Sequence, residues 1–416
     1  MPGARDQERS RVLLAYTAFV LVGVSAAVGG VLLPAQILDY GVSKATIGLI
    51  FVTGSAGFAL SGVTAGALIH RAGFRTALAV GGAAYLLAAL GTAARPPFVV
   101  LVLVQVLLGY GTGVLESVLN AYLAGLPEPG GPLNRLHAFF GVGALIGPSL
   151  AAWMLSRVSW PTVWLVLALL CVPLLVASLM AYPRAALAEP SPEPEQPARG
   201  RERLLAAALR ERAVVLGAVF LSIYVGLEMS VGSWAFTFLI ENWHQRDVLA
   251  GYAVTGYWLG LTVGRFVISP LGSRLGLRAI SITSGCLVGV GLGAVLVWLA
   301  PVAFLASAGL AVLGFFLGPL FPTVMSVAPR LTVPRLVPTA VGLMVGTSVV
   351  GGAALPWLAG VIAQHAGAWT LLPYSIGLTA LLGTVWWRLA RRLPPWQEQP
   401  RRTRPGRPAA APDAAR

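Results

Sequence analysis

The stretch FVVLVLVQVLLGYGTGVLESVLNAYLA, residues 98 to 124, carries a single charged side chain, Glu116, in a run long and apolar enough to cross a membrane. An ionisable group within a bilayer costs about 3 kcal/mol or more, so such a residue faces a bundle interior or a wet cavity and marks a solute or proton pathway. Asn120 lies one helical turn after Glu116 and shares its face. The stretch therefore predicts a membrane protein and provides two candidate site residues.

The composition of the whole chain agrees with this stretch, because 57% of the residues are hydrophobic and only 11% are charged. In a typical soluble protein about a quarter of the residues are charged. We predict an all-α membrane protein, since lipid cannot satisfy the hydrogen-bonding groups of an open backbone. Twelve apolar runs have the length of a membrane span. They cover residues 12 to 37, 45 to 69, 75 to 94, 98 to 124, 134 to 156, 160 to 181, 213 to 240, 248 to 271, 278 to 299, 302 to 326, 336 to 364 and 369 to 390.

The distribution of the 29 Lys and Arg residues predicts the orientation of the chain. With the N-terminus inside, 24 of the 29 lie on the cytoplasmic side, Arg265 lies within a span, and the outside holds only Lys44, Arg95, Arg157 and Arg246. This asymmetry follows the positive-inside rule, so we expect a multi-pass protein of the inner cell membrane with both termini in the cytoplasm. The net charge of +14 does not indicate a nucleic-acid partner, because the arginines lie in loops and tails rather than on one basic face. The first run is longer than the core of a signal peptide and should remain as the first helix.

A linker rich in proline and charge, residues 183–212, follows the sixth span. Its first part, EPSPEPEQPARGRER, is expected to hold no packed structure, and LLAAALRERAV is expected to form a short surface helix. The predicted units are a six-helix repeat at 1–182, the cytoplasmic linker, a second six-helix repeat at 213–392 and a disordered basic tail at 393–416. For the tail arginines we favour solvation over contact with anionic lipid headgroups.

An internal repeat supports the division into two equivalent halves. At an offset of 203 residues no gap is needed across the first four spans of each half. We therefore predict two parallel six-helix repeats related by an axis along the membrane normal. The offset places Gly57 on Gly260, Gly111 on Gly314, and Arg71, Gly73 and Arg75 on Arg274, Gly276 and Arg278.

The segment GALIHRAGFR, Gly66 to Arg75, resembles the Gly-x-x-x-Asp-Arg-x-Gly-x-Arg loop signature of the major facilitator superfamily. A glycine permits the tight turn, and arginines at this place meet helix C-termini, where the helix dipole favours cations. His70 and Ser273 occupy the two Asp positions of the signature. The resemblance implies a gating or coupling role for the loop arginines, Arg71, Arg75, Arg274 and Arg278.

Five further segments together resemble the fucose-permease-like, or sugar–proton symporter, branch of this superfamily, and the resemblance covers all twelve spans. In that branch a glutamate at the position of Glu116 takes part in sugar or proton handling, together with an Asp in the first helix. Gly30 occupies that Asp position here, so we expect Glu228 to provide the second acidic group. The segments are LESVLNAYL from Leu115, NRLHAFFGVGALIGPSL from Asn134, YVGLEMSVGSW from Tyr224, GYWLGLTVGRF from Gly256 and LGPLFPT from Leu317.

The residues alone place Glu228 near the middle of the membrane. It lies about 22 Å along its helix at 1.5 Å per residue, slightly past the midplane, where transporter sites are found. Arg265 and Glu116 lie at similar depths in opposite halves, from which we hypothesise a Glu116–Arg265 pair. Loss of water favours the protonated form of a carboxylate and a nearby guanidinium favours the ionised form, so such a pair is a proton switch if it closes in only one conformation.

Structural roles compete with these functional ones. Each glutamate could instead hydrogen-bond to a neighbouring helix, and Arg265 could equally cap helix ends. The aromatic residues Trp234, Tyr257 and Trp258 either stack on a sugar ring or fill the core. His137, at the start of a span, fits a surface or capping role.

We therefore predict a secondary active transporter rather than an enzyme, whose halves rock about a central site during proton-coupled uptake of a sugar or similar small polar solute. The sequence contains no P-loop, metal cluster or nucleophile triad, and we expect no cofactor beyond the proton gradient as energy source. The expected partners are the solute, protons and the lipid bilayer, with the chain as a monomer. Proton-antiport efflux of an amphipathic compound is the alternative, and a membrane receptor that kept the transporter fold is a third class.

Overall fold

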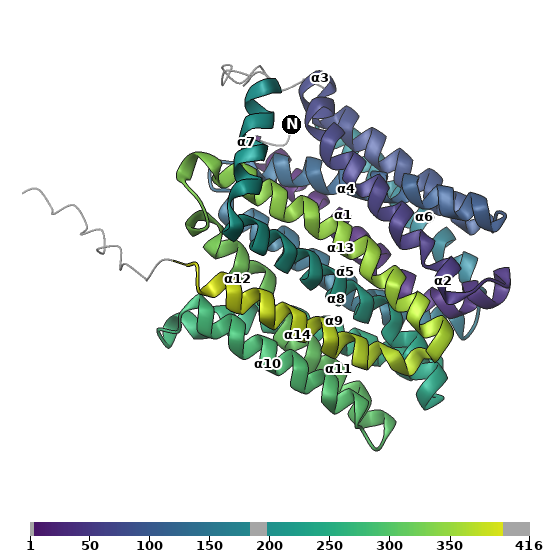
Figure 1. The fold of residues 1–416 in the computed structure, drawn as a ribbon. Coiled ribbons are helices and arrows are strands. Elements are labelled where there is room, and N and C mark those ends of the chain that lie inside the picture. Colours follow the sequence, from purple (N-terminus) through teal and green to yellow (C-terminus); the bar gives the residue numbers. More distant parts are fainter. Residues whose placement is uncertain (1–3, 184–197, 394–416) are drawn as a thin grey trace, which may run out of the picture.

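Long α-helices form nearly all of the described chain, which in this computed structural model comprises residues 4–183 and 198–393 (Figure 1). The N-terminal half consists of α1 (Ala4–Tyr40), α2 (Lys44–Ile47), α3 (Leu49–Ala93), α4 (Phe98–Ala124), α5 (Gly130–Leu155) and α6 (Trp160–Ala181). The linker helix α7 (Ala198–Arg210) follows. The C-terminal half consists of α8 (Arg212–Trp243), α9 (Asp247–Arg274), α10 (Ala279–Trp298), α11 (Ala303–Leu317), α12 (Leu320–Val327), α13 (Val337–Ala366) and α14 (Leu371–Ala390), with the short 3-10 helices η1 (Ala328–Arg330), η2 (Pro334–Leu336) and η3 (Ala368–Thr370).

The predicted spans are all helical, with differences in detail. Ten helical stretches of the described chain are long and apolar enough to cross a membrane. One of them, Lys44–Ala93, bends at Gly73 and contains two predicted spans. The predicted span that corresponds to α9 contains Arg265 and lies outside these ten. The span predicted at 302–326 is broken between α11 and α12, because Pro319 at the break has no N–H to continue a helix.

The linker is more helical than the sequence predicts. α7 begins at Ala198, whereas the expected surface helix begins at Leu204. The remaining part of the linker and the basic tail, both predicted to lack packed structure, lie at 184–197 and 394–416, outside the described residues.

The glycines of the internal repeat have equivalent roles in the two halves. A Cβ on Gly57 would lie 1.9 Å from a backbone carbonyl oxygen of α4, and a Cβ on Gly260 would lie 2.1 Å from one of α11. Only glycine allows two helix backbones to approach so closely. Gly73 and Gly276 both have positive φ, at 78° and 67°, in the turns that join successive helices. The repeat in the sequence is therefore a repeat of helix packing.

The two halves meet along three helix pairs, α1 with α8, α3 with α13 and α5 with α9. We call the end of the bundle that carries α2 the α2 end, and the opposite end, which carries α7 and the turn at Gly73, the α7 end (Figure 1). Both names are used below without reference to the sides of a membrane.

The α3–α13 pair diverges from the α2 end toward the α7 end. At the α2 end, a Cβ on Gly48 would lie 3.1 Å from the ring of Trp357. Helical spacing turns four further glycines toward roughly the same faces of the two helices. A Cβ on any of these four would meet nothing within 4 Å, and they are Gly62 and Gly66 of α3 and Gly342 and Gly346 of α13.

Candidate functional site

Glu116 and Asn120 lie on consecutive turns of α4, and both residues are partly exposed although α4 is almost wholly apolar. The Asn120 amide nitrogen donates a hydrogen bond to the backbone carbonyl oxygen of Glu116 at 2.8 Å, so Asn120 is held along its own helix. Within the described chain the Glu116 carboxylate has no hydrogen-bond or ion-pair partner. Its negative charge is thus not compensated by a described side chain.

Four polar side chains of the C-terminal half gather around Glu228. The Tyr257 hydroxyl of α9 donates a hydrogen bond to the backbone carbonyl oxygen of Glu228 at 2.9 Å. The Glu228 carboxylate and the Arg265 guanidinium lie within electrostatic range of each other and of the Tyr224 hydroxyl. Among the described residues no direct ion pair closes between the two charges, and the buried Tyr224 hydroxyl has no hydrogen-bond partner. We call Tyr224, Glu228, Tyr257 and Arg265 the Glu228 cluster.

Arg265 is not placed with Glu116, which corrects the pairing inferred from their similar depths. Its Nε donates a hydrogen bond to the backbone carbonyl oxygen of Gly318 at 3.3 Å, where α11 ends. The charged and polar groups around it are those of the Glu228 cluster and, across the interface between the halves, the exposed His137 of α5. Depth along a helix fixes the level of a side chain but not its direction, and Arg265 turns toward α8 and α11.

Trp258 covers α8 one turn beyond Glu228. A Cβ on Gly232 would lie 2.7 Å from the Trp258 ring, which also packs edge-on against Tyr257 at 5.4 Å between ring centroids. The buried indole Nε1 of Trp258 has no hydrogen-bond partner in the described chain. An unpaired buried polar group costs about 1–3 kcal/mol. Trp258 Nε1 and the Tyr224 hydroxyl are thus two unpaired groups near Glu228 that hydroxyls of a small solute could satisfy.

Trp234 belongs to the contact between the halves at the α2 end. Its side chain is only 3% exposed, and its Nε1 donates a hydrogen bond to the backbone carbonyl oxygen of Pro356 at 2.9 Å. Its ring packs edge-on against Phe51 of the N-terminal half at 6.3 Å between centroids. Of the three aromatic candidates, Tyr257 and Trp258 therefore adjoin Glu228, whereas Trp234 lies within the packed contact.

The α1–α8 contact also explains the absence of a carboxylate in α1. A Cβ on Gly30 would lie 2.7 Å from both the Cα and the carbonyl oxygen of Ser233, so an Asp side chain does not fit here in this state. The contact lies just over one turn beyond Glu228. On the α5–α9 pair, the hydroxyls of Ser149 and Thr255 are 2.5 Å apart and join the halves a second time.

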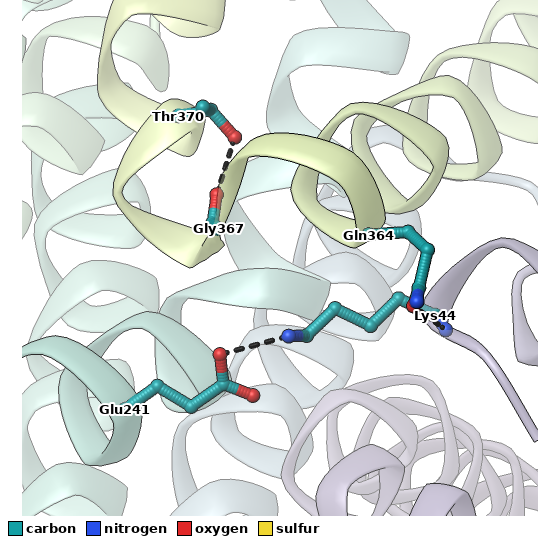
Figure 2. Close-up of polar contacts among 5 residues, drawn as sticks. All are labelled: Lys44, Glu241, Gln364, Gly367 and Thr370. Carbon is teal, nitrogen blue, oxygen red and sulfur yellow. Dashed lines mark hydrogen bonds and ion pairs between the residues drawn. The ribbon is translucent and has the colours of Figure 1, made fainter.

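Charged and amide groups complete the closure at the α2 end (Figure 2). Lys44 Nζ of α2 lies 2.8 Å from Glu241 Oε2 of α8, and the Lys44 backbone N–H donates to Gln364 Oε1 of α13 at 2.8 Å. In the same view, the Thr370 hydroxyl donates to the carbonyl oxygen of Gly367 at 2.7 Å and tightens the turn between α13 and α14. One lysine thus connects the N-terminal half to two helices of the C-terminal half.

The four loop arginines lie at the α7 end beside the two positive-φ glycines. Arg71, Arg274 and Arg278 are exposed and Arg75 is partly buried. None of the four forms an ion pair with a carboxylate of the described chain. This agrees with the loss of the signature Asp, whose first position is occupied by His70.

Two parts of this arrangement are absent from the sequence-based expectations. Tyr224 precedes Glu228 by one turn of α8, and the spacing of four residues was sufficient to identify it as a neighbour. The Lys44–Glu241 ion pair joins residues 197 positions apart. Opposite charges at the outer ends of two spans were the only signal for that pair.

Comparison with known proteins agrees with the fold. The family model described as Major Facilitator Superfamily matches residues 15–242 and again 229–412. Bypass of stop codon protein 6 of Saccharomyces cerevisiae is 26% identical, over 91% of this chain and 82% of its own length. A glucose/galactose transporter of Brucella abortus biovar 1 is also 26% identical, over 73% of this chain and 75% of its own length.

Solved structures show the same architecture. The nucleoside transporter NupG superposes with a TM-score of 0.76 over 91% of this chain and 99% of its own, at 14% identity. The fucose:proton symporter FucP of E. coli superposes with a TM-score of 0.62 over 91% of this chain and 97% of its own, at 18% identity. At these identities the structures establish the fold alone.

Proposed function

This chain belongs to the Major Facilitator Superfamily, and we propose that it is a proton-coupled transporter that takes up a sugar or a similar small polar solute across the inner cell membrane. One observation carries the proposal. The halves are joined at the α2 end, while Glu116, Glu228 and Arg265 remain partly exposed within long membrane-spanning helices. A carboxylate that is reachable from one end only is the arrangement that alternating access requires.

The proposed orientation places the α7 end in the cytoplasm, since the loop arginines and α7 lie there and Lys and Arg favour that side. The described state is then closed to the outside. The divergence of α3 and α13 toward the α7 end supports an inward-facing state. Rocking of the halves would separate Lys44 from Glu241. A partly exposed ion pair contributes only about 0.2–1 kcal/mol, so it can break in every cycle.

The two glutamates have different proposed roles. Arg265 compensates the charge of Glu228, which is therefore suited to bind solute hydroxyls as a carboxylate together with Tyr224 and Trp258. Glu116 has no such cation, so its charge becomes costly when the site closes and water leaves. We assign proton carriage to Glu116. The gradient of protons is the energy source, and no other cofactor is proposed.

The names of the relatives guide the choice of solute. One relative is a glucose/galactose transporter, and a gallate transporter of Pseudomonas putida is 29% identical over 44% of this chain. A sugar offers several hydroxyls to the unpaired groups near Glu228 and an apolar ring face to Trp258. Sugars are therefore the first solutes to test.

Counterflow in proteoliposomes tests this function. The full-length chain is reconstituted and loaded with unlabelled glucose, galactose, a nucleoside or gallate, and uptake of the labelled compound is followed. We expect sugar counterflow, and accumulation when the pH outside is lower than inside. A proton ionophore should remove the accumulation but not the counterflow. Extrusion of a lipophilic cation without exchange of any of the four solutes would replace the proposal by the efflux alternative.

A further inference from the structure

A basic cavity lies at the α7 end on the outside of the C-terminal half, away from the Glu228 cluster. It has a volume of about 730 Å³ and is formed by α7, the start of α8 and the end of α14. Arg212 comes from α8, and Arg388, Arg391 and Arg392 come from the last turn of α14 and the residues after it. Leu209 of α7 and Trp387 of α14 are among the apolar residues that complete the wall.

The four arginines of this cavity are exposed and unneutralised. Each is exposed to solvent, and none forms an ion pair with a carboxylate of the described chain. The Arg391 guanidinium lies 3.6 Å from the centroid of the Trp387 ring, a cation–π contact that fixes its direction. Guanidinium groups bind phosphate oxygens in bidentate geometry, and several together hold a phosphate strongly. The cavity therefore has the chemistry of a phosphate-group site.

An apolar groove continues from this basic cavity between α8 and α13. Its volume is about 260 Å³, and it shares Leu209 and Val215 with the basic cavity. It then follows α8 from Val215 to Ser222, about 10 Å at 1.5 Å per residue. Val219 and Val350 are 41% and 64% exposed along it. A free phosphate would use only the basic cavity, whereas a phospholipid would fill the basic cavity with its headgroup and the groove with an acyl chain.

We propose that the arginine cavity and the adjoining groove form a binding site for one anionic phospholipid. The arginines recognise the phosphate, α7 covers the headgroup, and Val219 and Val350 contact the first part of an acyl chain. Basic pockets between membrane helices on the cytoplasmic side suit anionic headgroups in this way. The site attaches the linker helix to α8 and α14, and it depends on membrane insertion rather than on the transported solute.

Native mass spectrometry of the detergent-purified full chain tests the site, with phosphatidylglycerol as probe and phosphatidylcholine of the same acyl chains as comparison. We expect preferential retention of phosphatidylglycerol. The R388Q/R391Q variant should bind it about 30-fold more weakly, from about 1 kcal/mol for each arginine. The matched control is R274Q/R278Q, which removes two exposed arginines from the same end outside the cavity and should bind phosphatidylglycerol as the parent does.

The acyl-chain part of the site needs its own variants. Val350→Glu places a charge in the groove and should weaken phosphatidylglycerol binding, while Arg212→Gln tests the headgroup part from a different helix if R388Q/R391Q fails to fold. Equal retention by the cavity variants and the control would overturn the site. Parent-like binding in the Val350→Glu variant, with inorganic phosphate displacing the lipid completely, would show a simple anion site and contradict a phospholipid site.

Discussion

At the scale of single residues, the two membrane glutamates differ in their partners rather than in their burial. Glu228 has a guanidinium within electrostatic range and two unpaired polar groups beside it, whereas Glu116 has only the backbone contact of Asn120 next to it. A carboxylate without a cation changes charge more readily on desolvation. This contrast is the physical basis for assigning the proton to Glu116 and the solute to Glu228.

Glu116→Gln should separate accumulation from exchange. The amide keeps the size and polarity of the side chain but carries no titratable proton, so proton-driven accumulation should fall to the level of equilibration, while sugar counterflow persists at about the parent rate. Both are measured in the same proteoliposomes. The exposed loop residue Glu128 gives the matched control, since Glu128→Gln makes the same chemical change outside the membrane.

Glu228→Gln should instead reduce counterflow itself, because the solute loses a charged acceptor. Parent-like accumulation in the Glu116→Gln variant, or loss of accumulation with intact counterflow in Glu228→Gln, would reverse the two assignments.

Trp258→Phe should weaken solute binding without unfolding the protein. Phenylalanine keeps most of the ring contact with Gly232 but removes the unpaired Nε1–H. A hydrogen bond is worth about 0.5–1.5 kcal/mol, so the half-saturation concentration for counterflow should rise about 2- to 10-fold. Trp369, which is 45% exposed, provides the control variant Trp369→Phe. An unchanged half-saturation concentration in Trp258→Phe would exclude its indole from the site.

At the scale of helices, glycine contacts decide which helices pack together. On α9, a Cβ on Gly260 would lie 2.1 Å from the Ala311 carbonyl oxygen, whereas a Cβ on Gly256 would find its nearest neighbour, the Ala311 side chain, at 3.7 Å. The same substitution one turn apart on one helix therefore has opposite consequences.

Gly260→Ala should lower stability by about 1–3 kcal/mol through overpacking of α9 against α11. Gly256→Ala should leave stability unchanged or raise it by up to about 1 kcal/mol, because alanine favours the helix more than glycine does. Thermal unfolding of the purified variants in one detergent compares them directly. Similar melting temperatures for the two variants would mean that the close α9–α11 contact is absent in the protein.

The helices were largely predictable from the sequence, because each apolar run must satisfy its own backbone in lipid. The repeat also predicted equivalent turns at Gly73 and Gly276, both of which have positive φ. The break before α12 was missed, since LGPLFPT is apolar throughout and hydropathy does not register the missing N–H of Pro319.

At the scale of the whole molecule, the contacts between the halves could not be derived from the sequence. The depth of Arg265 was correctly judged to lie within a span, but its direction depends on how α9 is rotated against α8 and α11. The contact of Gly30 with Ser233 likewise depends on the arrangement of two distant helices. The chemistry of the candidate site was therefore visible residue by residue, and the grouping of those residues was not.

The central claim is that the halves separate at the α2 end in each transport cycle. The pair Ser149 and Thr255 offers the sharpest test, because their hydroxyls are 2.5 Å apart across the interface and the native Cys171 and Cys286 are buried. The double variant S149C/T255C is reconstituted, oxidised, and assayed for sugar counterflow before and after reduction. Formation of the cross-link is verified by mass spectrometry. We predict no counterflow in the oxidised protein and recovery on reduction; counterflow at the parent rate with the cross-link intact would contradict the account.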